Sequence, residues 1–225
     1  MTDDRPLIDW TWIVEHLDDI WFRTGQHLSL ALISVVAGFA ISFALALLVL
    51  RDRRAYGPIT GAAGVLYTIP SLALFAALIP ITGLSTLTAV IPLTLYTLLI
   101  LVRNIVAGFD AVPAEVREAA DAMGMTRLAR LRRIELPLAI PLIVAGLRLA
   151  TVSTIGLVMV VTLIGNNFGG LGLFIKEGIQ AFFATKVYVG ALLSVGLAVL
   201  ADVVLVRVER GLTPWARARA ERAVG

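Results

Sequence analysis

Residues 27–50 read HLSLALISVVAGFAISFALALLVL, an apolar run long enough to cross a hydrocarbon layer about 30 Å thick. The run ends at the charged cluster Arg51-Asp52-Arg53-Arg54. It lacks the broad polar stripe that a helix on the surface of a soluble protein shows. The stretch therefore predicts a membrane-spanning helix and argues against a soluble helical bundle.

The rest of the chain repeats this pattern. Of its 225 residues, 59% are hydrophobic and 16% are charged, and the mean hydropathy is +0.91. Soluble domains carry roughly 25% charged residues, so this excess of apolar side chains is too large for one buried core. We expect an all-α, polytopic bundle of about five spans. The expected spans are residues 27–50, 57–79, 85–108, 138–164 and 187–206.

The orientation follows from the lysines and arginines between these spans. The loop 51–56, the stretch 103–137 and the tail 207–225 hold fourteen of them, whereas the alternate segments hold four. Basic residues accumulate on the cytoplasmic side of a membrane. We therefore expect an extracytoplasmic N-terminal segment (1–26), a membrane domain (27–206) and a basic cytoplasmic tail (207–225) of a multi-pass membrane protein.

Several other classes of function find little support. The chain has no cysteine and only two histidines, His16 and His27, so a metal site held by these residue types is not expected. The basic residues follow the membrane topology, which argues against nucleic-acid binding. The first 25 residues lack a basic n-region, so we expect no cleavable signal peptide.

The most informative segment outside the spans is residues 110–137, DAVPAEVREAADAMGMTRLARLRRIELP. Residues 114–123 are good helix formers, and Gly124 is suited to end that helix in a left-handed conformation. Thr126 can cap a second helix that begins at Arg127. Pro137 is expected to stop this second helix before the fourth span. The segment predicts a helix, a tight turn and a second helix outside the bilayer.

Seven residues of this segment resemble the EAA loop of bacterial ABC importer permeases, with the pattern E-A-A-x3-G-x9-I-x-L-P. The matching residues are Glu118, Ala119, Ala120, Gly124, Ile134, Leu136 and Pro137. The resemblance implies a MetI-like transmembrane fold in which this loop seats in a groove of a separate ATPase subunit. It also implies a second permease subunit, two ATPase subunits and an extracytoplasmic binding protein.

The chemistry of ATP hydrolysis is not expected in this chain. It contains no G-x-x-x-x-G-K-[ST] phosphate loop, so ATP and magnesium would be used by the partner ATPase. We therefore expect a permease subunit with no catalytic residue and no cofactor of its own.

The resemblance extends over about residues 25–210 and favours one branch of the importers. The sequences of stretches 67–74, 146–156 and 165–172 resemble those of permeases for glycine betaine, carnitine, choline or related quaternary amines. A permease for an amino acid such as methionine is the alternative. A membrane structural subunit or a secondary transporter is a second alternative, although the chain shows no internal repeat.

A few side chains within the expected spans are candidates for the pathway. Tyr67, Phe75 and Tyr96 have aromatic faces that can attract a cation, although aromatic residues in spans more often serve packing. Arg148 and Asp202 are charges within the spans, which mark functional sites by default. An arginine on the path would repel a quaternary amine, so we expect structural or pairing roles for Arg148 and Asp202.

Overall fold

The computed structural model describes residues 7–214, apart from the side chain of Asn166. All regular structure within that range is helical, as expected, while residues 1–6 and 215–225 of the expected terminal segments lie outside it. The longer helices are α2 (Leu17–Arg51), α3 (Tyr56–Thr68), α4 (Ser71–Thr82), α5 (Thr86–Asp110), α8 (Leu136–Val161) and α10 (Ala184–Leu212). The shorter ones are α1 (Trp10–Glu15), α6 (Ala114–Ala122), α7 (Arg127–Arg130) and α9 (Gly172–Gln180).

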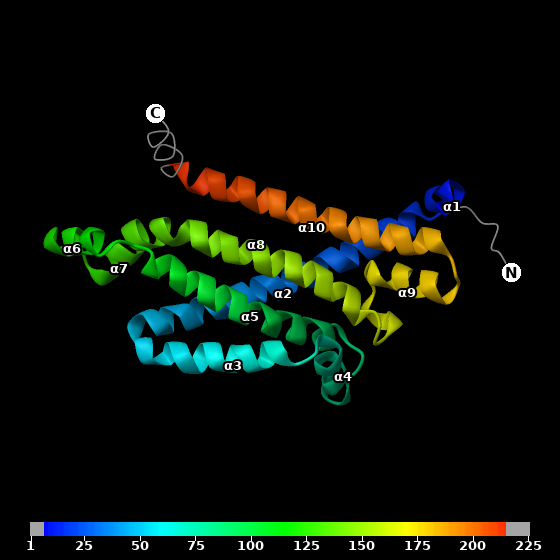
Figure 1. Cartoon of the computed structure of the whole chain (residues 1–225), viewed down its shortest axis with the longest axis horizontal. Helices are drawn as coiled ribbons and strands as arrows, with labels where there is room; N and C mark the ends of the chain where they lie inside the picture. Colours follow the sequence, from blue (N-terminus) through cyan, green and yellow to red (C-terminus); the bar gives the residue numbers. More distant parts are fainter. Residues whose placement is uncertain (1–6, 215–225) are drawn as a thin grey trace.

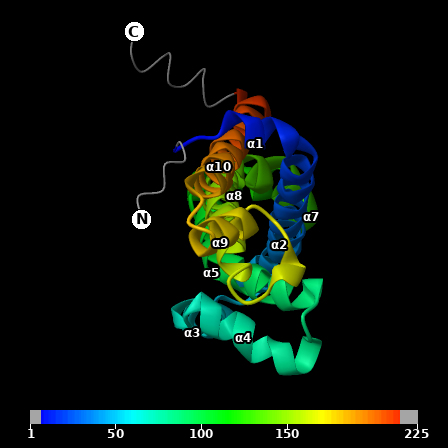
Figure 2. The same cartoon turned by 90° about the vertical axis from the view of Figure 1, so that its right-hand side faces the viewer.

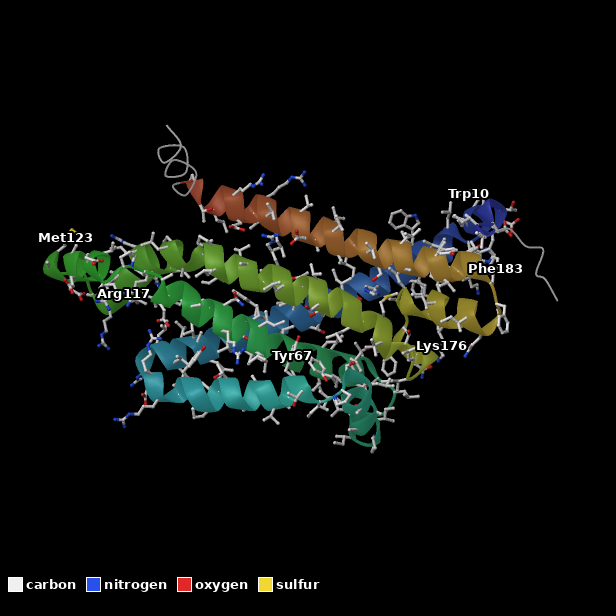
Figure 3. The ribbon with its side chains drawn as sticks, in the orientation of Figure 1. Trp10, Tyr67, Arg117, Met123, Lys176 and Phe183 are labelled. Atoms are coloured by element: carbon white, nitrogen blue, oxygen red, sulfur yellow. The ribbon has the colours of Figure 1, made fainter. Side chains whose placement is uncertain are left out.

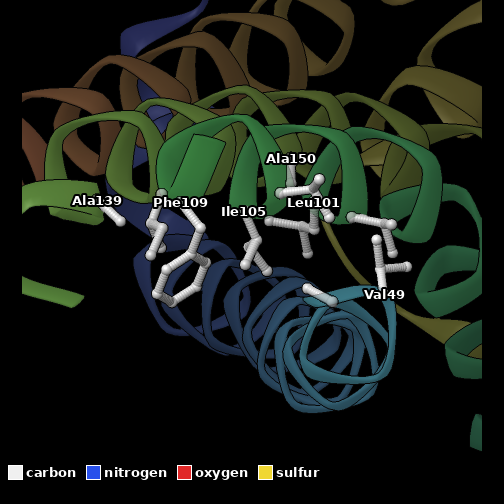
Figure 4. Packing of buried hydrophobic residues seen from close by; sticks show 10 residues of the cluster. Val49, Leu101, Ile105, Phe109, Ala139 and Ala150 are labelled. Carbon is white, nitrogen blue, oxygen red and sulfur yellow. The ribbon is translucent and has the colours of Figure 1, made fainter. Parts of the chain in front are cut away.

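Three helices, α2, α5 and α8, form the centre of the bundle (Figure 1). Their buried faces meet in a cluster that includes Val49 of α2, Ile105 and Phe109 of α5, and Ala139 of α8 (Figure 4). On the outside, α10 packs on α8 and α9, and α3 packs on α5. Viewed from one end, α3 and α4 lie to one side of this group (Figure 2).

Small residues let the central helices approach closely. A Cβ atom on Gly146 of α8 would lie 2.4 Å from the Cβ of Asn104 on α5. A Cβ atom on Gly108 would lie 2.9 Å from the carbonyl oxygen of Ala139. Lipid tails are as apolar as the helices, so such close packing replaces the hydrophobic effect as the source of helix association.

The second expected span is not a single helix. Within residues 7–214, four helices are each long and apolar enough to cross a membrane, and a fifth crossing requires α3 and α4 to be counted together. These two are bent by 94° at Ile69-Pro70. Pro70 has no N–H to give the carbonyl of Leu66, which accepts instead from the amide of Ile69 at 3.3 Å. The expected span 57–79 therefore consists of two helices that meet at a sharp bend.

The expected stop at Pro137 is also wrong. The helix that begins at Arg127 continues without a break to Val161. Residues Leu131–Glu135 form a π-helical turn, in which the amide of Leu136 bonds to the carbonyl of Leu131. This wider turn accommodates a residue without an N–H, so Pro137 lies near the start of α8 and does not end the helix.

Two further boundaries differ from the expectation. The first spanning helix begins at Leu17, so most of the described part of segment 1–26 is helical. The last helix extends to Leu212, into the expected tail. The described parts of the three basic segments nevertheless gather at one end of the bundle, because α6, the turn after α2 and the end of α10 lie on the same side in Figure 1. We call this the hairpin end, because the helical hairpin formed by α6 and α7 lies there.

Close packing at Gly146 is expected to limit stability. Gly146→Ala places a methyl group against the side chain of Asn104 and forces α5 and α8 apart, so the apparent Tm of the purified chain in detergent should fall by several degrees. Gly156→Ala is the matched control on the same helix, because nothing lies within 4 Å of its added Cβ. Equal Tm values for the two variants would contradict this account of the α5–α8 contact.

Candidate functional site

The helix α6 ends in a tight reversal at Gly124. The amide of Gly124 donates to the carbonyl of Asp121 at 2.9 Å, and the amide of Met125 donates to the carbonyl of Ala120 at 3.2 Å. This pair of bonds is a Schellman motif, which needs a left-handed residue after the helix. Gly124 has φ of 73°, as the sequence predicts. A side chain there would meet no neighbour, so the constraint lies in the backbone alone.

The second helix of the hairpin begins as predicted. The hydroxyl of Thr126 accepts a hydrogen bond from the amide of Ala129 at 3.3 Å and so caps α7. Since α7 runs directly into α8, the hairpin is an extension of a spanning helix. Residues 113–137 therefore connect the end of α5 to the start of α8 mainly through helices, and we refer to them as the α6–α7 hairpin.

Glu135 contacts an arginine on each of the two helices of the hairpin. Its carboxylate accepts from Nε of Arg130 at 2.8 Å and lies 3.7 Å from Nε of Arg117. Arg130 also donates to Asp121, and Arg117 donates to the carbonyl of Phe109 at the end of α5. Glu135 is buried, with 12% of its side chain exposed. One carboxylate thus links α6, α7 and the start of α8.

The seven residues of the EAA pattern divide into two groups. Glu118, Ala119 and Gly124 are exposed on the hairpin. Ile134, Leu136 and Pro137 are half-buried at its junction with α8. Ala120 is fully buried, so its methyl group packs inside the hairpin and not at the exposed surface.

The exposed tip of the hairpin is partly apolar. Met123 is 70% exposed and Leu128 is 54% exposed. Figure 3 shows Met123 at the far end of the hairpin, with Arg117 nearer to the bundle. Apolar side chains grouped at an exposed tip are typical of a docking surface.

Arg148 and Asp202 form a two-armed ion pair between α8 and α10. Nε and Nη2 of Arg148 donate to the two carboxylate oxygens of Asp202 at 2.8 and 3.1 Å. Glu209 lies 3.9 Å from Nη1 of the same arginine. The pair borders an open groove of about 650 Å³. Pairing lowers the cost of charge at membrane depth and supports a structural role.

The fold brings two of the three aromatic candidates together and places the third elsewhere. Tyr67 and Tyr96 contact each other edge to face, with ring centroids 5.9 Å apart. Phe75 is 1% exposed and packs in the core with Leu30 and Leu93. Tyr67 and Tyr96 line an open cavity near the α3–α4 break, whereas Phe75 does not line it.

Comparison with known proteins identifies the chain. Residues 28–214 match the family described as binding-protein-dependent transport system inner membrane component. The chain belongs to this family. It is an inner-membrane component of a bacterial transport system, and its helices provide the membrane-spanning part.

The permease has similar relatives along nearly its whole length. It is 39% identical to the osmoprotectant import permease protein OsmW of Salmonella typhimurium, covering 85% of this chain and 90% of OsmW. It is 34% identical to the glycine betaine/carnitine/choline transport system permease protein OpuCB of Bacillus subtilis, covering 87% and 89% of the two chains.

Solved structures confirm the MetI-like fold. A chain of the inward-facing MetNI methionine ABC transporter matches with a TM-score of 0.78 at 22% identity, covering 88% of this permease and 98% of that chain. A chain of an amino acid ABC transporter crystallised with histidines matches with a TM-score of 0.73 at 19% identity. At these identities the likeness concerns the fold alone.

Sequence reasoning missed the residues that brace the hairpin. Glu135 occupies the variable position between Ile134 and Leu136, so the EAA pattern does not mark it. A signal was nevertheless present, because Glu135 is a single acidic residue that follows four arginines at the start of an apolar run. Its partners Arg117 and Arg130 could be found only from the folded structure.

Loss of the Glu135 charge should loosen the hairpin. Glu135→Gln keeps the shape but removes the charge that accepts a hydrogen bond from Arg130 and pairs with Arg117 at 3.7 Å. A hydrogen bond to a charged group is worth about 1.5–3 kcal/mol. Hydrogen–deuterium exchange over residues 114–130 should become at least tenfold faster, while exchange within α5 and α8 stays unchanged. Glu115→Gln, on the exposed start of α6, is the control. Unchanged exchange rates in Glu135→Gln would contradict the claim that Glu135 stabilises the hairpin.

The Arg148–Asp202 pair predicts a non-additive result. Asp202→Asn leaves an arginine without its main partner at membrane depth, and the apparent Tm in detergent should fall. The double replacement Arg148→Met with Asp202→Leu removes both charges and should recover most of the loss. A double variant that is less stable than Asp202→Asn would contradict a mainly structural pair.

Proposed function

We propose that this permease belongs to an ATP-driven importer of quaternary-amine osmoprotectants such as glycine betaine, carnitine and choline. The observation that carries the proposal is the 34–39% identity to OpuCB and OsmW along most of each chain. The amino-acid transporters that share the fold reach only 19–22% identity. The pairing of Arg148 with Asp202 also supports it, because it offsets a positive charge that would repel such a substrate.

In this proposal the α6–α7 hairpin couples the permease to a separate ATPase. The exposed Glu118, Ala119 and Met123 offer a small, partly apolar surface to the partner. The Glu135 ion pairs and the continuous helix from Arg127 make the hairpin stiff. Closure of the ATPase on ATP and magnesium would move the hairpin as a unit and tilt α5 and α8. The permease itself catalyses no reaction.

The assembly would contain two permease subunits, either identical or paralogous, two ATPase subunits and an extracytoplasmic binding protein. The hairpin end would face the cytoplasm and the N-terminus the outside. The excess of lysine and arginine in the segments at the hairpin end supports this orientation. Selection of the substrate would rest chiefly on the binding protein.

Gly124 gives a direct test of coupling. Gly124→Val places a β-branched residue at φ of 73°, which is strained, whereas Gly124→Asn is tolerated better in that conformation. We expect Gly124→Val to insert normally but to lose uptake and co-purification of the ATPase, and Gly124→Asn to retain much of both. Normal uptake by Gly124→Val would count heavily against a coupling role.

The substrate class needs a separate experiment. The permease, reconstituted with its partner ATPase and binding protein, should import labelled glycine betaine or choline in proteoliposomes only when ATP is present. Labelled methionine is the comparison substrate. Uptake of methionine without uptake of any quaternary amine would overturn the proposed substrate class while leaving the coupling proposal intact.

A further inference from the structure

A cavity of about 410 Å³ lies at the break between α3 and α4. Tyr67 of α3, Ser71 of α4, Tyr96 of α5 and Ser153 of α8 all contribute to its lining. Tyr67 lies about halfway along the molecule in Figure 3. Polar and aromatic groups from four helices therefore converge at one place between the two ends of the bundle.

The two tyrosines have different positions in this cavity. Tyr67 is 45% exposed, so its ring is open to the cavity, whereas Tyr96 is 6% exposed. The hydroxyl of Tyr96 donates to the carbonyl of Ile69 at the break. Tyr96 thereby fixes the bend, and its edge-to-face contact holds the ring of Tyr67 in one orientation.

The electrostatics of the cavity favour a weakly hydrated cation. Its lining contains no charged side chain among the described residues. The ends of α3 and α4 meet there with opposite dipoles, so neither end alone sets the sign of the potential. Arg148 lies in the neighbouring groove and is paired with Asp202. The remaining directional feature is the aromatic face of Tyr67, which attracts quaternary ammonium groups.

The geometry points to a transient quaternary-ammonium subsite on the translocation path, in which Tyr67 contacts the cation and Tyr96 is a positioning residue. This inference rests on the proposed function. The cavity is open, and a single aromatic face binds a cation weakly. The substrate therefore dissociates quickly from this subsite. The separate binding protein remains the high-affinity site.

The test compares substitutions at Tyr67 in the complete importer, reconstituted with saturating binding protein and labelled choline. A cation contact predicts that Tyr67→Trp and Tyr67→Phe keep at least half of the uptake rate, whereas Tyr67→Leu lowers it about tenfold. Stimulation of ATP hydrolysis by the loaded binding protein should persist in all three. Tyr188→Leu is the control, because Tyr188 is similarly exposed but lies on α10, away from the cavity.

A second measurement covers the case in which the leucine variant does not assemble. Tyr67→Trp adds an indole at the cavity, and its fluorescence, after subtraction of the wild-type signal, should change with choline but not with the uncharged isostere 3,3-dimethylbutan-1-ol. Equal responses to both compounds, or a leucine variant as active as phenylalanine, would overturn the subsite. Wild-type importer that takes up no quaternary amine would instead refute the proposed function itself.

Discussion

A chain that crosses hydrocarbon has no water to satisfy its polar groups, and three features within residues 7–214 meet that constraint inside the protein. At the α3–α4 break, the carbonyl of Ile69 accepts from the hydroxyl of Tyr96. Before Pro137, which has no N–H, the helix widens into a π-helical turn in which the amide of Leu136 bonds to the carbonyl of Leu131. At Arg148, two charge-assisted bonds to Asp202 supply the partner. The departures from regular helices therefore coincide with the candidate functional features.

The same principle makes the hairpin mechanically useful. A loop outside the lipid could be flexible, because water would satisfy its backbone. Here Glu135 ties together both helices of the hairpin, and Arg117 ties it to the end of α5. A stiff hairpin that continues into α8 can transmit a displacement along a spanning helix, whereas a loose one would absorb it.

Local signals in the sequence predicted what depends on neighbouring residues. The spans follow from apolar runs, the left-handed Gly124 from the helix that precedes it, and the cap at Thr126 from the helix that follows. The sequence did not predict the 94° break, because Pro70 is compatible with an ordinary kink and its supporting hydroxyl lies on another helix.

The pairing of Arg148 with Asp202 and the burial of Ala120 were also hidden from the sequence. The two charges lie 54 positions apart and meet only when α10 packs on α8. Ala120 is buried because the reversal at Gly124 folds α7 back toward α6. Both features depend on contacts between different helices, and a single sequence does not reveal these contacts.

The side of the membrane on which the hairpin lies tests the account most directly. The chain has no native cysteine, so single cysteines at Met123 and Phe182, which are 70% and 84% exposed, can be labelled cleanly. With a membrane-impermeant maleimide on intact spheroplasts, Phe182→Cys should react, and Met123→Cys should react only after permeabilisation. Labelling of Met123→Cys from outside would place the hairpin away from any cytoplasmic ATPase and contradict the account.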